Sequence, residues 1–150
     1  MSNYITFAKS EDAVEIAKME KEFFSSPWSE NAILSEINAP DSVFLVSKKN
    51  NNITGYISGR DIAGEFYINN IAVKKEFRRQ GTAFLLLSGI VNSAKERNCE
   101  FITLEVRASN YPAIALYKKT GFEFLGERKN FYSNPKENAA IYTFFFNKRI

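Results

Sequence analysis

The feature that most constrains this chain is the basic turn Arg78-Arg79-Gln80-Gly81-Thr82-Ala83, which follows a strand-like stretch and precedes a helical one. The stretch before it ends in Asn70-Ile71-Ala72-Val73, and residues 82–98 after it carry apolar side chains at helical spacing. Glycine at position 81 allows the backbone to approach a ligand closely, and the unpaired N–H groups that open the next helix attract anions. The pattern predicts a pyrophosphate site, although strand, basic turn and helix also describe an ordinary crossover with a solvated turn.

Further motifs downstream of this helix help to decide between a pyrophosphate site and an ordinary crossover. They are Leu104-Glu105-Val106-Arg107-Ala108-Ser109-Asn110, Ala113-Ile114-Ala115-Leu116-Tyr117 and Gly121-Phe122. In order and spacing, the basic turn and these segments resemble the GNAT superfamily of N-acetyltransferases. Together with residues 70–73 and the tripeptide Pro27-Trp28-Ser29, they resemble the RimI-type enzymes, which acetylate the N-terminal alanine of a small-subunit ribosomal protein. The resemblance extends over nearly the whole chain.

The resemblance implies acetyl-CoA as the co-substrate and assigns residues that would hold it. The pantetheine arm is expected along a strand formed by Ile71, Ala72 and Val73. The pyrophosphate is expected against a loop formed by Arg79, Gln80, Gly81, Thr82, Ala83 and Phe84. Asn110 has two interpretations: it suits the N-cap of a helix with proline in its first turn, and the matching asparagine of the family also contacts the cofactor.

Two residues are candidates for the proton transfers that accompany acetyl transfer to an amine. Glu105 lies in a strand with apolar neighbours, where partial burial would suit a base, and an ion pair with Arg107 or a nearby lysine is the alternative. Tyr117 lies on a short helix and could be a core aromatic whose hydroxyl finds any acceptor. The resemblance implies that Glu105 is the general base and that Tyr117 is the acid that protonates coenzyme A.

The segments at Pro27-Trp28-Ser29 and at residues 128–132 match family segments that border the peptide channel. The resemblance therefore implies substrate contacts for Trp28 and Tyr132. Taken alone, the tripeptide fits a helix break with a packed indole equally well. The chain departs from the family pattern at Ala83, at Tyr111-Pro112 and at Phe131, and the last departure bears on recognition of the substrate terminus.

The remaining pattern predicts a single domain, residues 1–150, of the α/β (α+β) class. Helices are expected from residue 10, with Val14, Ala17 and Met19 in the apolar stripe, and at residues 29–38, 82–98 and 111–120. Strands are expected at residues 4–8, 43–47, 53–60, 65–73, 101–106, 122–128 and 139–146. Short turns predict antiparallel pairing before residue 73, and alternating strands and helices predict parallel pairing after it. A mixed, mostly antiparallel central sheet with helices on both faces follows.

Composition excludes several classes of function. The chain has no histidine, so Ser/His and Cys/His catalysis and histidine-based zinc sites are excluded, and no metal is expected. The single cysteine, Cys99, is expected to be a buried small hydrophobe in a reducing compartment. The net charge of +3 is dispersed, which disfavours nucleic acid. No apolar run reaches bilayer length, which predicts a cytoplasmic protein with no membrane association.

The leading hypothesis is an acetyl-CoA-dependent N-terminal protein acetyltransferase whose partner is the N-terminus of a ribosomal protein. Within the same fold, the alternative is an acetyltransferase of a small-molecule amine or a lysine side chain. A non-catalytic module that binds acyl-CoA or nucleic acid is a third hypothesis. Retention of both Glu105 and Tyr117 and the dispersed charge disfavour that third hypothesis.

Overall fold

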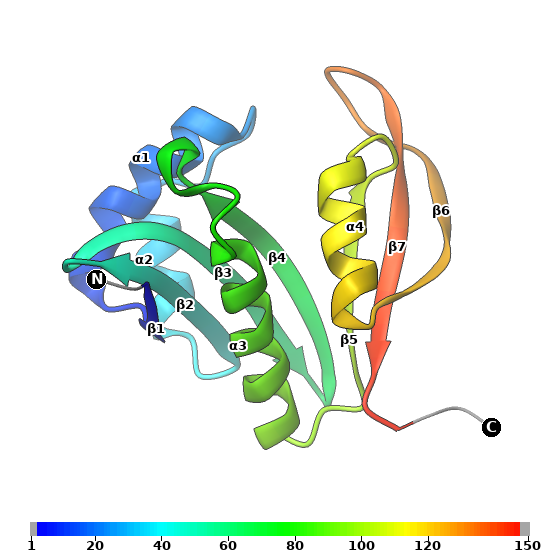
Figure 1. Ribbon diagram of the computed structural model, residues 1–150, viewed down its shortest axis with the longest axis horizontal. Coiled ribbons are helices and arrows are strands. Elements are labelled where there is room, and N and C mark those ends of the chain that lie inside the picture. The colour runs from blue at the N-terminus through cyan, green and yellow to red at the C-terminus, as the bar shows by residue number, and fades with distance from the viewer. Residues whose placement is uncertain (1–2, 148–150) are drawn as a thin grey trace.

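The computed structural model describes residues 3–147, which form a seven-stranded sheet with α-helices on both faces (Figure 1). The strands are β1 Tyr4–Phe7, β2 Ser42–Lys49, β3 Asn52–Ile62, β4 Glu65–Val73, β5 Phe101–Arg107, β6 Glu123–Tyr132 and β7 Glu137–Phe145. The helices are α1 Ala13–Phe23, α2 Glu30–Asn38, α3 Thr82–Glu96 and α4 Tyr111–Thr120, with short 3-10 turns at Ser10–Asp12 and Lys75–Phe77. Within residues 3–147, no helix combines the length and hydropathy needed to cross a bilayer.

The strand order is β1-β2-β3-β4-β5-β7-β6, and only the β4–β5 pair is parallel within the described sheet. The expected fold class, a mixed and mostly antiparallel sheet covered on both faces, is confirmed. The expectation that β5 and β6 pair directly is wrong. β7 returns between them and pairs antiparallel with both, so the two strands run the same way without pairing with each other.

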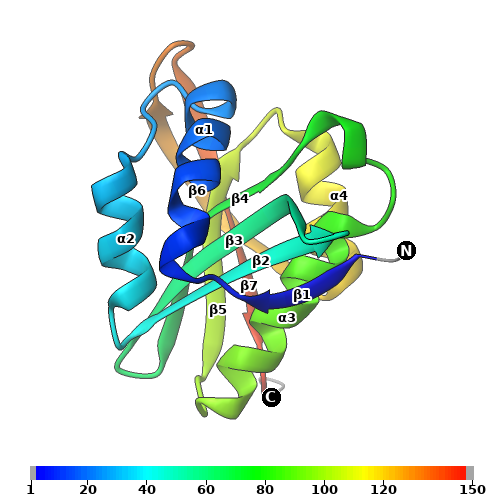
Figure 2. The same cartoon turned by 90° about the vertical axis from the view of Figure 1, so that its left-hand side faces the viewer.

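The helices divide between the two faces and create two hydrophobic clusters. α1 and α2 lie together over β2 to β4 (Figure 2), where Ile16, Met19 and Ile33 pack against Val46 and Tyr56. On the other face, α3 and α4 pack against both halves of the sheet through a larger cluster. Cys99 belongs to that larger cluster, as expected for a small hydrophobe, and burial raises the pKa of its thiol to about 11.

The start of the first helix differs from the expectation. Residues 10–12 form a 3-10 turn, because the Asp12 carboxylate accepts a hydrogen bond from the Lys9 N–H at 2.8 Å and closes the turn. The α-helix then begins at Ala13, and Ala13, Ile16 and Ala17 face the core. Val14, expected in the apolar stripe, is 48% exposed. The expected burial of Ala17 and Met19 is confirmed.

β4 changes phase at a β-bulge and then separates from β5. Ser58 pairs with Asn70 and Gly59 with Ile68, so Asn69 has no partner on β3. A bulge bends its strand and increases the local twist. The parallel ladder with β5 ends at the Tyr67–Thr103 pair, just before the bulge. Beyond that pair the two strands diverge, as Figure 1 shows.

The tight packing at the bulge generates a stability prediction for Gly59→Ala. A Cβ at position 59 would lie 2.3 Å from the Phe66 ring and 2.7 Å from the Tyr67 carbonyl oxygen. Because backbone must move to relieve this overlap, the free energy of unfolding should fall by about 1–3 kcal/mol. Chemical denaturation measures it. Gly64→Asn is the control, since nothing lies within 4 Å of its added Cβ and asparagine is the L-residue that best tolerates a left-handed φ such as the 86° found there. Equal stability of Gly59→Ala and the parent would contradict the packing described here.

Candidate active site

The basic turn before α3 presents unpaired backbone N–H groups. Arg79 and Gly81 adopt left-handed conformations, with φ of 61° and 80°. Gly81 occupies the N-cap position of α3 and supplies no side-chain cap. The Thr82 hydroxyl does not cap the helix either, because it donates to the Phe77 carbonyl at 3.3 Å and accepts from the Asn3 amide at 3.2 Å. The first N–H groups of the helix are therefore available to an anion.

A hollow of about 390 Å³ lies at this end of α3. Its lining residues are Asn3, Lys49, Gln80, Gly81, Thr82, Phe84 and Leu85. Lys49, from the end of β2, adds a cation to the site, and Lys119 of α4 places its ammonium 5.8 Å from the centre of the Phe84 ring. Positive charge and free N–H donors together make a site suited to a pyrophosphate.

The part of β4 beyond the bulge offers a free backbone edge. The Lys74 N–H bonds to the Thr54 carbonyl of β3 at 2.9 Å. Because hydrogen-bonded and non-hydrogen-bonded pairs alternate in an antiparallel ladder, Ala72 also bonds toward β3, and the polar groups of Ile71 and Val73 face the opened side. An extended ligand could pair with this edge as an added strand does.

Arg78 occupies part of that edge. Its Nε donates to the Val73 carbonyl oxygen at 3.0 Å, and its guanidinium lies 5.0 Å from the centre of the Phe23 ring on α1. Both arginines are exposed, but Arg78 makes these two contacts with protein groups, whereas Arg79 lies on the turn. Of the two adjacent arginines, Arg79 is the less constrained by protein contacts.

Asn110 caps α4, as one of its two interpretations predicts. Its side-chain oxygen accepts a hydrogen bond from the Ala113 N–H at 3.3 Å, and Pro112 follows in the first turn. Gly121 ends the same helix in a left-handed conformation. A contact between Asn110 and a cofactor stays a prediction.

Glu105 lies on the face of β5 opposite the α3 and α4 cluster. Burial alternates along the strand, so Leu104 and Val106 enter that cluster while Glu105 points to the other face. Its Oε2 is shielded from solvent, makes no hydrogen bond with any described residue, and lies 3.6 Å from the Arg128 Nε. Glu105 thus forms an ion pair, but with Arg128 of β6 and not with Arg107 or a lysine as the alternative expected. Arg107 instead binds Glu137 at 3.4 Å.

Tyr117 is a buried core aromatic, with 5% of its surface exposed. Its ring packs against Phe122 and Tyr142, with centroids 5.9 and 6.4 Å away. Burial first, and then the nearby Tyr132 phenol, raise the pKa of Tyr117 to about 12. The hydroxyl makes no hydrogen bond within residues 3–147 that would occupy its proton. The phenol stays protonated across the neutral range and is free to donate.

Glu105 and Tyr117 approach the site from opposite faces of the sheet, because Tyr117 packs with Leu104 and Val106. A continuous sheet would keep such groups apart. The β4–β5 ladder ends at the Tyr67–Thr103 pair, so β5 has no hydrogen-bonded partner on β4 at the level of Glu105. Tyr132 interacts electrostatically with both residues. Burial and then the Glu105 carboxylate raise the pKa of Tyr132, and the Tyr132 phenol contributes to the raised pKa of Tyr117.

The two expected substrate residues lie on separate segments. Trp28 lies half-buried between α1 and α2, and its backbone N–H donates to the Glu20 carboxylate at 2.9 Å. Tyr132 ends β6, half-buried, with the Arg107 guanidinium 4.6 Å from its ring centre. Arg107 also donates to the Ser133 and Pro135 carbonyls at 2.9 and 2.8 Å, which holds the β6–β7 turn. Substrate contacts of Trp28 and Tyr132 stay predictions.

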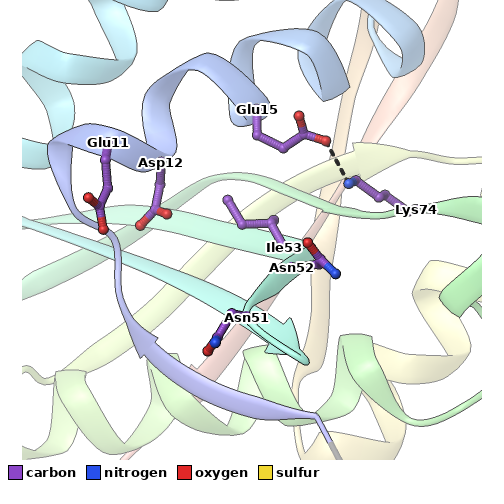
Figure 3. Close-up of a pocket in the computed structure, with 7 residues that line it drawn as sticks. All are labelled: Glu11, Asp12, Glu15, Asn51, Asn52, Ile53 and Lys74. Atoms are coloured by element: carbon purple, nitrogen blue, oxygen red, sulfur yellow. Dashed lines mark hydrogen bonds and ion pairs between the residues drawn. The ribbon is translucent and has the colours of Figure 1, made fainter.

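A second hollow of about 320 Å³ lies between α1 and the β2–β3 turn (Figure 3). It is lined by Glu11, Asp12, Glu15, Asn51, Asn52, Ile53 and Lys74. Lys74 is paired with Glu15 at 2.7 Å, and Asp12 with Lys48 at 3.1 Å. Since these charges satisfy one another, we assign this hollow no part in the site.

Comparison with known proteins decides the family. Residues 13–122 match the acetyltransferase (GNAT) family. The chain belongs to this family. A candidate ribosomal protein bS18-alanine N-acetyltransferase of Bacillus subtilis is 36% identical over 132 residues, 87% of each chain. An N-alpha-acetyltransferase of Saccharolobus solfataricus is 30% identical over 143 residues, 87% of this chain and 86% of the relative.

A solved structure agrees with this membership. The ribosomal-protein-S18-alanine N-acetyltransferase of Escherichia coli matches with a TM-score of 0.88 and 27% identity, covering 99% of this chain and 97% of that one. The GNAT fold and an N-acetyltransferase activity, both expected from the motifs, are confirmed. The individual roles of the site residues stay predictions.

Sequence reasoning missed several features of this GNAT site. The bulge had a signal, because the apolar alternation at Phe66 and Ile68 resumes one position late at Ile71 and Val73. The burial of Glu20 also had a signal in the sequence, since this acidic residue falls on the buried stripe of α1. Lys49 had none, and the pairing of Arg128 with Glu105 had none, because both depend on strand register.

The uncapped start of α3 generates a prediction about acetyl-CoA. In Gly81→Asp the carboxylate would add negative charge beside the helix N–H groups and compete for them. We expect the affinity for acetyl-CoA to fall at least about tenfold below that of Gly81→Asn, which has the same size without the charge. Calorimetric titration of both folded variants measures the difference. Equal affinities of the two variants would show that the pyrophosphate does not bind at this turn.

Proposed function

We propose that this GNAT protein transfers the acetyl group of acetyl-CoA to the N-terminal α-amine of a protein, and that its acceptor is an alanine-initiated ribosomal protein. The observation that carries the proposal is the divergence of β4 from β5, which leaves a backbone edge open beside the uncapped start of α3. An acyl-pantetheine arm can pair with that edge while its pyrophosphate meets the helix. The acceptor is supported by the names of the relatives.

The proposed reaction forms an amide C–N bond and breaks the thioester C–S bond. The amine nitrogen attacks the acetyl carbonyl and gives one proton to Glu105, directly or through a water molecule. Coenzyme A leaves as a thiolate and takes a proton from Tyr117. Glu105 ends the step protonated and Tyr117 ends it as a phenolate, so one proton passing between them through solvent restores both.

The absence of histidine favours an α-amine over a lysine side chain as the acceptor. An α-amine with a pKa near 8 is neutral about one time in ten at pH 7, whereas a lysine near 10.4 is neutral well under one time in a thousand. A carboxylate base therefore needs roughly 3 kcal/mol less to obtain a neutral α-amine. Glu105, which has Arg128 on one side, is therefore suited to removing a proton from an α-amine.

Tyr117 is a weaker acid than an ordinary phenol. With its pKa at about 12, donation to a thiolate near 8.5 is uphill by about 5 kcal/mol before the site stabilises the products. A hydrogen bond to the developing thiolate offsets part of this difference. We therefore expect the loss of Tyr117 to lower kcat less than the loss of Glu105 does.

These assignments predict unequal effects of two substitutions. Glu105→Gln should lower kcat by about ten- to a thousandfold, because the base is lost. Tyr117→Phe should lower kcat by a smaller factor that is constant from pH 6 to 9, since a phenol with a pKa of about 12 does not titrate there. Steady-state kinetics with acetyl-CoA and an alanine-initiated peptide measure both.

Each variant has a matched control. Glu123→Gln removes an exposed carboxylate from β6, and Tyr142→Phe removes a phenol from the same aromatic cluster as Tyr117. Both controls should keep the parental kcat. If Glu105→Gln and Tyr117→Phe also overlay the parent across the pH range, neither residue carries the proton chemistry.

The choice of acceptor predicts a preference between two peptides. We compare kcat/KM for an alanine-initiated peptide with that for the same peptide blocked at its N-terminus and containing lysine. The free α-amine should react faster by at least about a hundredfold, which corresponds to most of the difference in deprotonation cost. Equal or faster turnover of the blocked peptide would reject the α-amine and favour a lysine acceptor.

A further inference from the structure

Glu20 is a carboxylate buried on α1, with 1% of its surface exposed. Its two oxygens accept from the Trp28 N–H at 2.9 Å, from the Asn70 amide at 3.2 Å, and from the Tyr56 hydroxyl. In the part of the chain that the structure describes, no lysine or arginine pairs with it. A buried carboxylate without a cation is costly unless several donors satisfy it, so the three hydrogen bonds account for its tolerance here.

The three donors come from three segments that meet at the Glu20 carboxylate. Trp28 belongs to the α1–α2 loop, Tyr56 to β3, and Asn70 to β4 just after the bulge. Within the described chain, residues 25–28 form no hydrogen bond other than the one from Trp28 to Glu20. That bond, together with the packing of Trp28 against the α1–α2 cluster, holds the loop, and the Asn70 bond ties Glu20 to the strand whose next residues form the free edge.

We propose that Glu20 is a positioning residue that holds the Trp28 loop against β4 and so sets the affinity for the acceptor terminus. The inference rests on the proposed acetyl transfer to a protein terminus. A carboxylate suits the position because a backbone N–H, a hydroxyl and an amide all donate to it, and an apolar side chain of the same length would leave all three unpaired. Glutamine keeps one acceptor oxygen and can bond a rotated Asn70 amide.

Trp28 provides a direct readout, because it is the only tryptophan of the chain. Glu20→Met should shift the tryptophan emission to longer wavelength and increase its quenching by acrylamide. The same variant should raise KM for the alanine-initiated peptide about tenfold or more, with the acetyl-CoA affinity changed less than about twofold. Glu20→Gln should lie close to the parent in all three measurements. Glu22→Met is the control, since Glu22 is exposed two residues away.

Several results would overturn the proposal. One is a folded Glu20→Met variant with parental emission and peptide KM. Another is an equal loss of peptide and acetyl-CoA affinity, which indicates a general structural role. If Glu20→Met does not fold, hydrogen exchange of the parent decides: the Trp28 amide should exchange slowly, and exchange as fast as at Ser25 and Ser26 rejects the bond. Emission and exchange need no turnover, so they separate this inference from a failure of the proposed reaction.

Discussion

The loss of pairing between β4 and β5 is the constraint on which the site depends. The parallel ladder ends at Tyr67 and Thr103, and the bulge at Asn69 turns β4 away. Because of that turn, the polar groups of Ile71 and Val73 face a gap rather than a neighbouring strand. A continued ladder would consume this edge and would close the sheet between Glu105 and Tyr117, which lie on opposite faces.

The two candidate proton-transfer groups are held in different ways. Glu105 pairs with Arg128, whose side chain is 59% exposed, and an ion pair of that kind contributes little to stability and exchanges partners easily. Tyr117 is fixed by aromatic neighbours in the core, and burial keeps its proton bound. The Glu105 carboxylate on one face of the sheet is therefore weakly held, whereas the Tyr117 phenol on the other face is a rigidly held neutral donor.

Local signals predicted much of the fold, and long-range register accounts for most of what they missed. α4 was predicted to the residue, since Asn110 caps it and Gly121 ends it. α2 begins after Ser29, whose hydroxyl accepts from the Ala32 N–H. The partner of Glu105 was not predictable, because the bulges of β6 decide which side chain of that strand comes near. The meeting of Glu20 with Trp28 likewise depends on tertiary packing.

An unpaired strand edge carries a hazard as well as a use, since any extended chain can add to it and begin aggregation. The bond from Arg78 to the Val73 carbonyl, anchored over the Phe23 ring, blunts that edge in the free protein. An incoming strand would have to displace this charged side chain before its own N–H could donate to the Val73 carbonyl. A small ligand whose anion binds the N–H groups at the start of α3 gains an interaction that offsets the loss of the Arg78 bond. The bond from Arg78 to Val73 is therefore an obstacle that an added polypeptide strand meets at this edge of the free protein.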